Sequence, residues 1–423
     1  MIRVKASRII SILSTKVKTT MAMDAHYQWP PYLLSILVHM FQRLLHVDIN
    51  KFQTRKMEKA VPMDARQLGY TMCRDSLGGV WAEIDENQFE ITPLSGGLTN
   101  YLYVCSLPSE VQAPDNQPRS VLLRVYGDIA TSSSFVVQNS VIFALMSEKG
   151  LGPKLYGMNP KARIEALLPA NCLQTVDLHN STISRQIAEK LALFHSLDMP
   201  LCKEPRFLNK TMDDWSVKVR DTLRRTCSRD EETYMQKFRN YHLEEELETL
   251  KLILSLVDSP VVFSHNDLQE GNILYTKEEN AMTVIDWEYC SYNYRGYDFG
   301  NHFIEWCYNY QVEEDPKFKV NLDNYPSRQQ QEEFFRAYLR TLDRDITDDL
   351  LQLMYVEANT FVLASHFFWG LWSILQNNMS TIEFGFLEYA ESRLDAYFLF
   401  KDRLPSEIVE RLNQHRQLKH STV

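Results

Sequence analysis

Residues 261–274 read VVFSHNDLQEGNIL, and they are the most informative stretch of the chain. The apolar beginning predicts a strand, and the polar residues that follow predict a short loop presenting Asp267 and Asn272. A hairpin is expected next, with strands over 272–275 and 282–285 on either side of a polar turn. The segment therefore predicts two polar side chains held by strands at a fixed separation.

The hairpin ends in a second carboxylate, Asp286, fourteen residues after Asn272. One carboxylate can orient a substrate hydroxyl and accept its proton, while the other carboxylate and an amide oxygen hold Mg²⁺. The set therefore indicates phosphoryl transfer from Mg–ATP. A His-x-Asp pair alone, here His265 and Asp267, would more often be a simple turn, and the full spacing is what favours chemistry.

The order and spacing of these residues resemble the catalytic loop and the metal-binding aspartate of the protein-kinase-like fold. Residues 264–272 (SHNDLQEGN) and 285–306 (IDWEYCSYNYRGYDFGNHFIEW) are similar, at almost every position, to the two signatures of the choline/ethanolamine kinase family. The similarity extends over about residues 30–403. It implies an α+β, bilobal fold with a small strand-rich N-terminal lobe and a large, mainly helical C-terminal lobe.

The resemblance also implies roles for the residues of the loop. Asp267 would be the catalytic base, Asn272 and Asp286 would bind the metal, and His265 would brace the loop. ATP is the implied co-substrate and Mg²⁺ the implied cofactor.

A second set of residues resembles the ATP-binding part of the family. The turn between the first two predicted strands resembles its phosphate loop, because two adjacent glycines let backbone N–H groups approach phosphate oxygens. Its residues are Ser95, Gly96, Gly97, Leu98, Thr99 and Asn100. Arg124, in the third predicted strand, matches the family's arginine and could reach the phosphates.

Two positions in this lobe depart from the family pattern. Asn139 stands where the family usually has a glutamate that pairs with the strand arginine, so no ion pair is expected there. Ala166 stands in the predicted hinge, residues 163–169, where the family usually has Gln or Glu. Lower activity or weaker ATP binding is the expected consequence.

The acceptor would be recognised by aromatic faces and carboxylates, because a quaternary ammonium has no N–H donor. The positions that match the family's choline-binding residues are Asp298, Glu305, Tyr310, Trp369, Trp372 and Tyr389. Aromatic residues at helical spacing are more often plain core, and Asp298 could instead support the catalytic loop.

The periodicity of the chain fits this architecture. Strands are expected over 89–94, 101–107 and 121–126, and helices over 30–58, up to 81, 132–149, 181–197, 211–225, 230–257 and from about 327 onward. The expected organisation is a flexible extension over 1–23, an ATP-binding lobe over 24–168 and a catalytic and substrate lobe over 169–423. The basic composition of the extension also fits a transit-like or membrane-touching segment.

The composition excludes several classes of protein. The net charge of −10 argues against a nucleic-acid partner, because such proteins usually present a basic face. Seven scattered cysteines without a Cys-x-x-Cys pair indicate reduced thiols and not a disulfide or zinc framework. The apolar run over 360–375 is too short for a stable membrane span and predicts a buried helix.

The resemblance implies that the chain phosphorylates choline with ATP, the first step of phosphatidylcholine synthesis, as a cytoplasmic homodimer. Ethanolamine kinase activity, alone or alongside, is the nearest alternative, followed by an aminoglycoside-type phosphotransferase. A catalytically silent relative that acts as a binding protein is the alternative from another class, and Asn139 and Ala166 are what suggest it.

Overall fold

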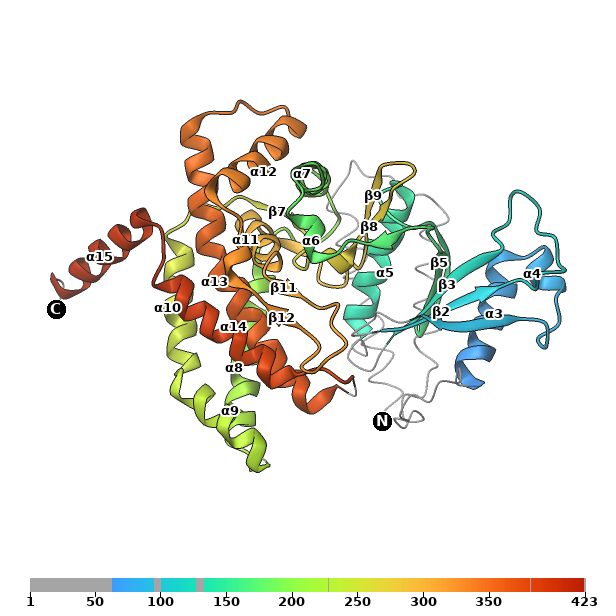
Figure 1. Cartoon of the computed structure of the whole chain (residues 1–423), viewed down its shortest axis with the longest axis horizontal. Helices are drawn as coiled ribbons and strands as arrows, with labels where there is room; N and C mark the ends of the chain where they lie inside the picture. The colour runs from blue at the N-terminus through green and yellow to red at the C-terminus, as the bar shows by residue number, and fades with distance from the viewer. Residues whose placement is uncertain (1–62, 95–99, 127–132, 227, 381, 422–423) are drawn as a thin grey trace, which may run out of the picture.

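The computed structural model of the protein describes residues 63–94, 100–126, 133–226, 228–380 and 382–421. The helices expected over 30–58, the extension over 1–23 and residues 95–99 of the phosphate loop lie outside the described residues. The described chain forms a strand-rich lobe and a larger helical lobe that lie side by side (Figure 1). The α+β bilobal fold is therefore confirmed.

The N-terminal lobe is built on a five-stranded antiparallel sheet. In pairing order its strands are β1 (Glu90–Leu94), β2 (Asn100–Ser106), β3 (Ser120–Tyr126), β5 (Ala162–Ala166) and β4 (Leu155–Met158). Helices α3 (Met63–Leu77) and α4 (Val80–Glu83) pack on this sheet, where Trp81 and Phe89 join Val121 and Leu123 in one apolar core. The three predicted strands are present, whereas β4 and β5 were not predicted.

Helix α5 (Ser133–Glu148) lies between the sheet and the helical lobe (Figure 1). Its residues Ile142 and Phe143 share a core with Phe263 and Trp287 of the C-terminal lobe. Because apolar side chains from both lobes fill this core, the two lobes are packed against each other and not merely tethered.

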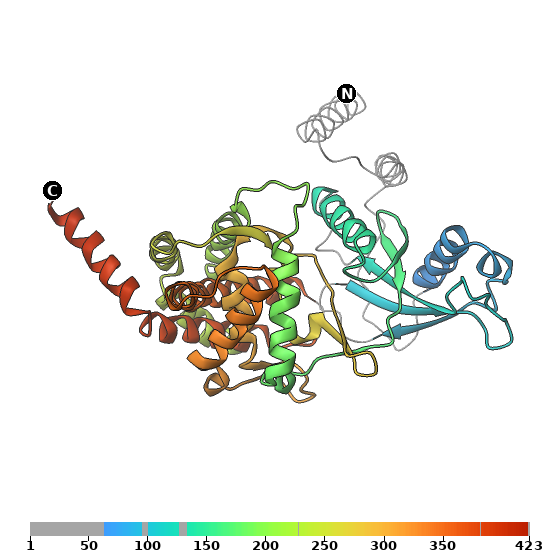
Figure 2. The ribbon, with the colours of Figure 1, turned by 90° about the horizontal axis from the view of Figure 1, so that it is seen from above.

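The C-terminal lobe is mainly helical. Its helices are α6 (Thr175–Leu178), α7 (Ser181–His195), α8 (Arg206–Leu223), α9 (Arg229–Asn240), α10 (Leu243–Ser255), α11 (Arg295–Glu305), α12 (Arg328–Thr341), α13 (Asp348–Met379), α14 (Phe386–Lys401) and α15 (Ser406–Ser421). Helices α11 and α14 both pack on the long helix α13, and α15 projects from the lobe (Figures 1 and 2).

Two sequence predictions about these helices can be checked. The single helix expected over 230–257 is wrong, because His242 has a left-handed backbone (φ 50°) that separates α9 from α10. The buried helix expected over 360–375 is confirmed as part of α13. None of the helices in the described ranges is long and apolar enough to cross a membrane.

Short strands in the C-terminal lobe position the catalytic segment. Strand β7 (Val261–Ser264) pairs with β10 (Ser291–Tyr294), and β8 (Ile273–Thr276) pairs with β9 (Ala281–Val284). The β8–β9 hairpin lies on the side of the lobe that faces the N-terminal sheet (Figures 1 and 2). The loop between β7 and β8 is thereby held at the junction of the lobes. The lobe boundary predicted at residues 168/169, just after β5, stays a prediction.

Candidate active site

In the loop after β7, the side chain of Asn272 holds Asp267 in position. The amide nitrogen of Asn272 donates to the Asp267 carbonyl at 2.8 Å and to its carboxylate at 3.0 Å. Asn272 itself sits in a one-turn 3₁₀ helix (Glu270–Asn272), and Asn266 turns the chain with φ 66°, a conformation that asparagine tolerates better than most residues. The amide oxygen of Asn272 is left outside these bonds, so it is available as a hard oxygen ligand.

His265 braces the same loop. Its Nε2 lies 3.0 Å from the carbonyl of Ile285, so Nε2 carries the proton and donates it. Its Nδ1 then accepts from the backbone N–H of Asp267 at 3.3 Å. Burial lowers the pKa of His265, which favours this neutral tautomer. The ring therefore links the loop to the end of the hairpin.

The hairpin brings Asp286 beside Asn272. The backbone N–H of Ile285 donates to the Asn272 carbonyl at 2.9 Å, which places the next residue, Asp286, at the mouth of the loop. Asp286 has φ 64° and its side chain is one quarter exposed (25%). The three polar residues predicted to act together, Asp267, Asn272 and Asp286, thus lie on adjoining segments.

The environment of Asp267 suits a group that accepts a proton. Burial raises the pKa of Asp267 well above its usual range, and the charges of Glu305 and Asp286 raise it further. The hydrogen bond from Asn272 acts in the opposite direction. A carboxylate with a raised pKa is a stronger base than an exposed aspartate.

Arg124 connects the two lobes at this point. Its guanidinium is buried, and Nη1 lies 3.3 Å from the Asp286 carboxylate while Nη2 lies 3.6 Å from Glu165 of β5. Burial alone would lower the pKa of Arg124, but Asp286 and Glu165 raise it, so the cation is held. Asn100, the one phosphate-loop candidate in the described residues, begins β2 and pairs in register with Tyr126 at the end of β3.

Arg124 has an ion-pair partner within its own lobe, although none is expected from the helix position Asn139. Glu165 supplies the carboxylate and is itself bound by Arg163 at 2.5 Å, so a strand and not the helix position Asn139 provides the partner. The predicted hinge also begins later than expected, because Arg163 to Ala166 belong to β5. Glu165 was missed because it lies within the segment whose sequence was interpreted as the hinge.

Asp298 lies behind the catalytic loop. Its carboxylate accepts from the backbone N–H groups of His265 at 2.8 Å and Asn266 at 2.6 Å, and from the ring of His195 at 2.9 Å. The side chain is fully buried. This geometry favours the second possibility raised by the sequence, that Asp298 supports the loop, over direct contact with a substrate.

Trp369 and Trp372, two predicted acceptor-binding residues, lie together on α13. Their rings are 5.5 Å apart and nearly perpendicular, and Trp369 also meets Tyr289 edge-on at 5.4 Å. The indole N–H of Trp369 donates to Asn301 of α11 at 2.8 Å, which fixes the orientation of its ring. The two tryptophans are mostly buried, so they belong to the lobe's core as well as to this cluster.

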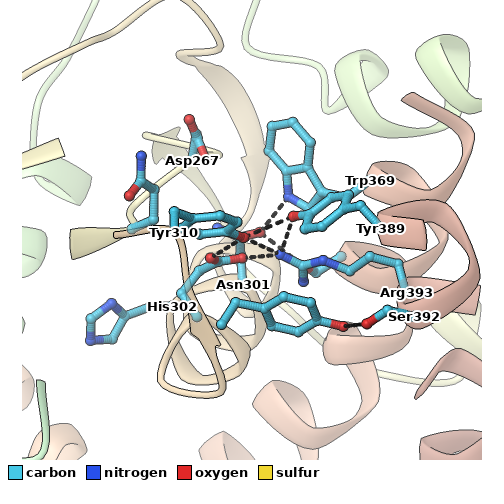
Figure 3. A network of polar contacts seen from close by, with 12 residues as sticks. Asp267, Asn301, His302, Tyr310, Trp369, Tyr389, Ser392 and Arg393 are labelled. Atoms are coloured by element: carbon cyan, nitrogen blue, oxygen red, sulfur yellow. Dashed lines mark hydrogen bonds and ion pairs between the residues drawn. The ribbon is translucent and has the colours of Figure 1, made fainter. Parts of the chain in front are cut away.

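Glu305, Tyr310 and Tyr389, the other predicted acceptor-binding residues, converge on a buried arginine, Arg393 (Figure 3). Nη2 of Arg393 pairs with Glu305 and lies 2.9 Å from the hydroxyl oxygen of Tyr310 and 2.5 Å from that of Tyr389, so its two N–H groups are shared among the three side chains. Tyr310 donates to the other oxygen of Glu305 at 2.8 Å. The sequence reasoning brought three of these four residues together and missed the fourth.

The missed residues carried weak signals. Tyr289 follows Asp286 by three residues inside the second family signature, and Arg393 follows Tyr389 by four residues, one helical turn. Asn301 lies between the predicted Asp298 and Glu305 on α11. The spacing of each missed residue from a predicted site residue could have suggested it, but its amino-acid type alone gave no sign of a role in the site.

Comparison with known proteins agrees with this geometry. The sequence matches the profile of the family described as choline/ethanolamine kinase over residues 91–398. It is 44% identical over 361 residues to a choline/ethanolamine kinase from Homo sapiens, covering 83% of this chain and 90% of that protein. It is 42% identical over 371 residues to choline kinase alpha from Mus musculus, covering 80% and 81%.

The fold is similar to that of a choline kinase from Cryptosporidium parvum. The TM-score is 0.67 at 28% identity, over 80% of this chain and 95% of the other. Sequence and structure thus point the same way, and the chain belongs to the choline/ethanolamine kinase family.

Proposed function

We propose that the chain transfers the γ-phosphoryl group of Mg–ATP to the hydroxyl of choline, giving phosphocholine and ADP. Membership of the family makes the chain a phosphotransferase with an alcohol acceptor, and choline and Mg²⁺ are the finer parts of the proposal. The observation that carries it is the position of Asp267. Its carboxylate accepts from the amide nitrogen of Asn272 at 3.0 Å, and it lies close enough to interact with Asp286 and with Tyr289, whose ring meets that of Trp369.

The residues of the chain divide the work of the reaction. Asp267 orients the acceptor hydroxyl and takes its proton as the new O–P bond forms, while ADP leaves with the electrons of the broken bond. Asn272 holds the Asp267 carboxylate in place, and Arg124 provides a fixed positive charge for phosphate oxygens.

The metal donors fit a hard divalent cation. The Asp286 carboxylate and the Asn272 amide oxygen are the oxygen ligands that Mg²⁺ prefers. Mg²⁺, when bound, supplies charge neutralisation for the transferring phosphoryl group.

The acceptor side favours choline over ethanolamine. A quaternary ammonium is attracted by aromatic faces and donates no hydrogen bond. Tyr289, Trp369 and Trp372 offer such faces close to the catalytic loop. A primary ammonium would instead require several free acceptors, so choline is the proposed substrate and ethanolamine the second candidate.

A coupled assay of ADP release tests the function. Wild-type protein with Mg–ATP should release ADP with choline, more slowly with ethanolamine, and only at background rate without an acceptor. Asp267→Asn should lower the choline rate by about 10²–10⁴-fold, the usual contribution of a general base. Asp345→Asn, an exposed aspartate, should leave it unchanged. Equal ADP release with and without choline would overturn the proposal.

We also propose a cytoplasmic homodimer that supplies phosphocholine for phosphatidylcholine synthesis. The resemblance to the choline/ethanolamine kinase family supports this. Light scattering on the purified full chain should give twice the 49.6 kDa chain mass, and a fluorescent fusion should distribute through the cytoplasm. A monomeric mass would contradict the homodimer, and a fusion confined to an organelle or membrane would contradict the cytoplasmic location.

A further inference from the structure

The carboxylate that was expected to attract the acceptor cation is already engaged. One oxygen of Glu305 pairs with Nη2 of Arg393, and the other accepts from the Tyr310 hydroxyl at 2.8 Å. Both charged side chains are nearly inaccessible, at 3% for Glu305 and 0% for Arg393. The pair therefore adds no net charge to the acceptor side.

The two tyrosine hydroxyls are engaged as well. Tyr310 gives its proton to Glu305, so in its 2.8 Å contact with Tyr389 it is the acceptor and Tyr389 the donor. Both hydroxyl oxygens also lie within hydrogen-bond distance of Nη2 of Arg393, whose two N–H groups they share with Glu305. The four side chains thus form a closed network in which each hydroxyl has both a donor and an acceptor role filled. Figure 3 shows Tyr310, Tyr389 and Arg393 of this network.

Arginine has a shape that permits this arrangement. Nη2 faces the three oxygen-bearing side chains. The central carbon of the guanidinium, Cζ, lies 3.8 Å from the centre of the Tyr308 ring and 4.9 Å from the centre of the Tyr389 ring. Within the described residues, Nε and Nη1 of Arg393 have no hydrogen-bond partner, and these ring faces are what they meet. A lysine would present a single nitrogen and no plane to stack.

The closed network should affect substrate alcohols with a primary ammonium and those with a quaternary ammonium differently. A primary ammonium carries three N–H donors, and leaving them unpaired in a buried place is costly. A quaternary ammonium needs aromatic faces and no hydrogen-bond acceptor. The rings of Tyr289, Trp369 and Trp372 offer such faces and take no part in the hydrogen bonds that close the network.

We propose that Arg393 is a positioning residue that sets the acceptor preference: by closing the network with Glu305, Tyr310 and Tyr389, it disfavours primary ammonium alcohols relative to quaternary ones. The inference rests on the proposed function, since it concerns the choice among that reaction's acceptors. The competing explanation is that Arg393 only neutralises the buried Glu305. In that case, replacing Arg393 would lower kcat/KM equally for all substrate alcohols.

The test compares kcat/KM for choline and for ethanolamine in matched variants of the full chain. Arg393→Met frees the Glu305 carboxylate, so the choline-to-ethanolamine ratio should fall about tenfold, the effect of roughly one charge-assisted hydrogen bond. Adding Glu305→Gln to Arg393→Met removes the freed charge and should restore the ratio. Arg403→Met, an exposed arginine, should leave both values unchanged.

Tyr310→Phe keeps the inference testable if Arg393→Met does not fold, as judged by its melting transition. This variant frees one oxygen of Glu305 without removing a charge, so it should shift the ratio in the same direction by about threefold. Equal losses for both alcohols in the folded variants would overturn the inference and leave the proposed function intact. A wild-type protein that phosphorylates neither alcohol would overturn both.

Discussion

His302 is a histidine that the fold keeps neutral. It lies on α11 with no exposed surface, its Nδ1 meets the Leu268 carbonyl at 3.1 Å, and its Nε2 accepts from the Trp306 indole at 3.3 Å. Burial lowers the pKa of His302 to about 4, although the bond to Leu268 and the charge of Asp298 act against this lowering. The ring thereby ties the end of the catalytic loop to the core.

This lowered pKa predicts a pH dependence of stability. Between pH 6.5 and about 4 the unfolded chain binds a proton at His302 that the folded chain does not, so the free energy of unfolding should fall as the pH drops through this range. Each tenfold difference in proton affinity between the folded and unfolded chains corresponds to about 1.4 kcal/mol of stability.

His302→Gln removes the titrating group while keeping a polar side chain. Its free energy of unfolding in urea should be lower than wild type at pH 7.5, because two buried contacts change, yet decline less steeply from pH 6.5 to 4.5. Parallel slopes for the two proteins would contradict the prediction. His415→Gln, on α15, serves as the control and should keep the wild-type slope.

At the residue scale, the sequence predicted the part of the site that is local. Asp267, Asn272 and Asp286 lie within twenty residues, so the hairpin alone brings them together. Arg393 is 88 positions from Glu305 and Glu165 is 41 positions from Arg124, so packing of distant elements decides these pairs. The separation of the two partners along the chain carries no information about such a long-range pair.

At the scale of elements, α11 and α13 cross at unusually close range. A Cβ at Gly300 would come within 2.6 Å of the Val362 backbone nitrogen and 2.8 Å of the Phe361 carbonyl carbon. Glycine is required here by the approach of two backbones. The close crossing is what lets Asn301, the next residue, reach the indole of Trp369.

Gly300→Ala should therefore be destabilising despite the better helix propensity of alanine. Backbone atoms cannot move aside as side chains do, so overpacking should cost about 1–3 kcal/mol beyond the propensity gain of about 1 kcal/mol. Gly370→Ala is the matched control, because a Cβ there meets the end of the Leu394 side chain at 2.9 Å. Urea unfolding should rank Gly300→Ala well below Gly370→Ala, and equal stabilities would contradict the close-crossing argument.

Each element that sequence reasoning missed has its own physical cause. Strand β5 carries Arg163 and Glu165 within the segment interpreted as the hinge, and each of these charged residues is buried because it pairs with the other. The break between α9 and α10 falls at His242, without the glycine or proline that usually marks a helix end. Strongly periodic elements such as β2, β3 and α7 were predicted nearly to the residue.

At the scale of the whole molecule, Arg124 is the charged link between the lobes. It reaches from β3 to Asp286 of the C-terminal lobe and to Glu165 of its own sheet. An arginine can face both carboxylates at once because its two terminal nitrogens point in different directions within the guanidinium plane. Proposed ATP contacts at this position would depend on the same geometry.

Arg124→Lys should weaken nucleotide binding more than acceptor binding. Lysine keeps the charge but cannot meet Asp286 and Glu165 together, so the KM for ATP should rise about tenfold while the KM for choline changes less than about twofold. Steady-state kinetics with each substrate varied in turn will measure this. Arg119→Lys, in the same lobe but bonded to loop carbonyls at Pro108 and Val111, should leave both constants unchanged. Equal rises in both constants for Arg124→Lys would contradict the assignment.

Helix α11 has a practical consequence for redesign. This one buried helix carries Asp298, which binds the catalytic loop, Asn301, which binds the indole of Trp369, and Glu305, which pairs with Arg393. Substitutions in α11 that admit a bulkier alcohol will therefore also disturb the loop that holds the base Asp267. Libraries that seek new acceptors should therefore leave α11 untouched and diversify the facing positions on α13 and α14.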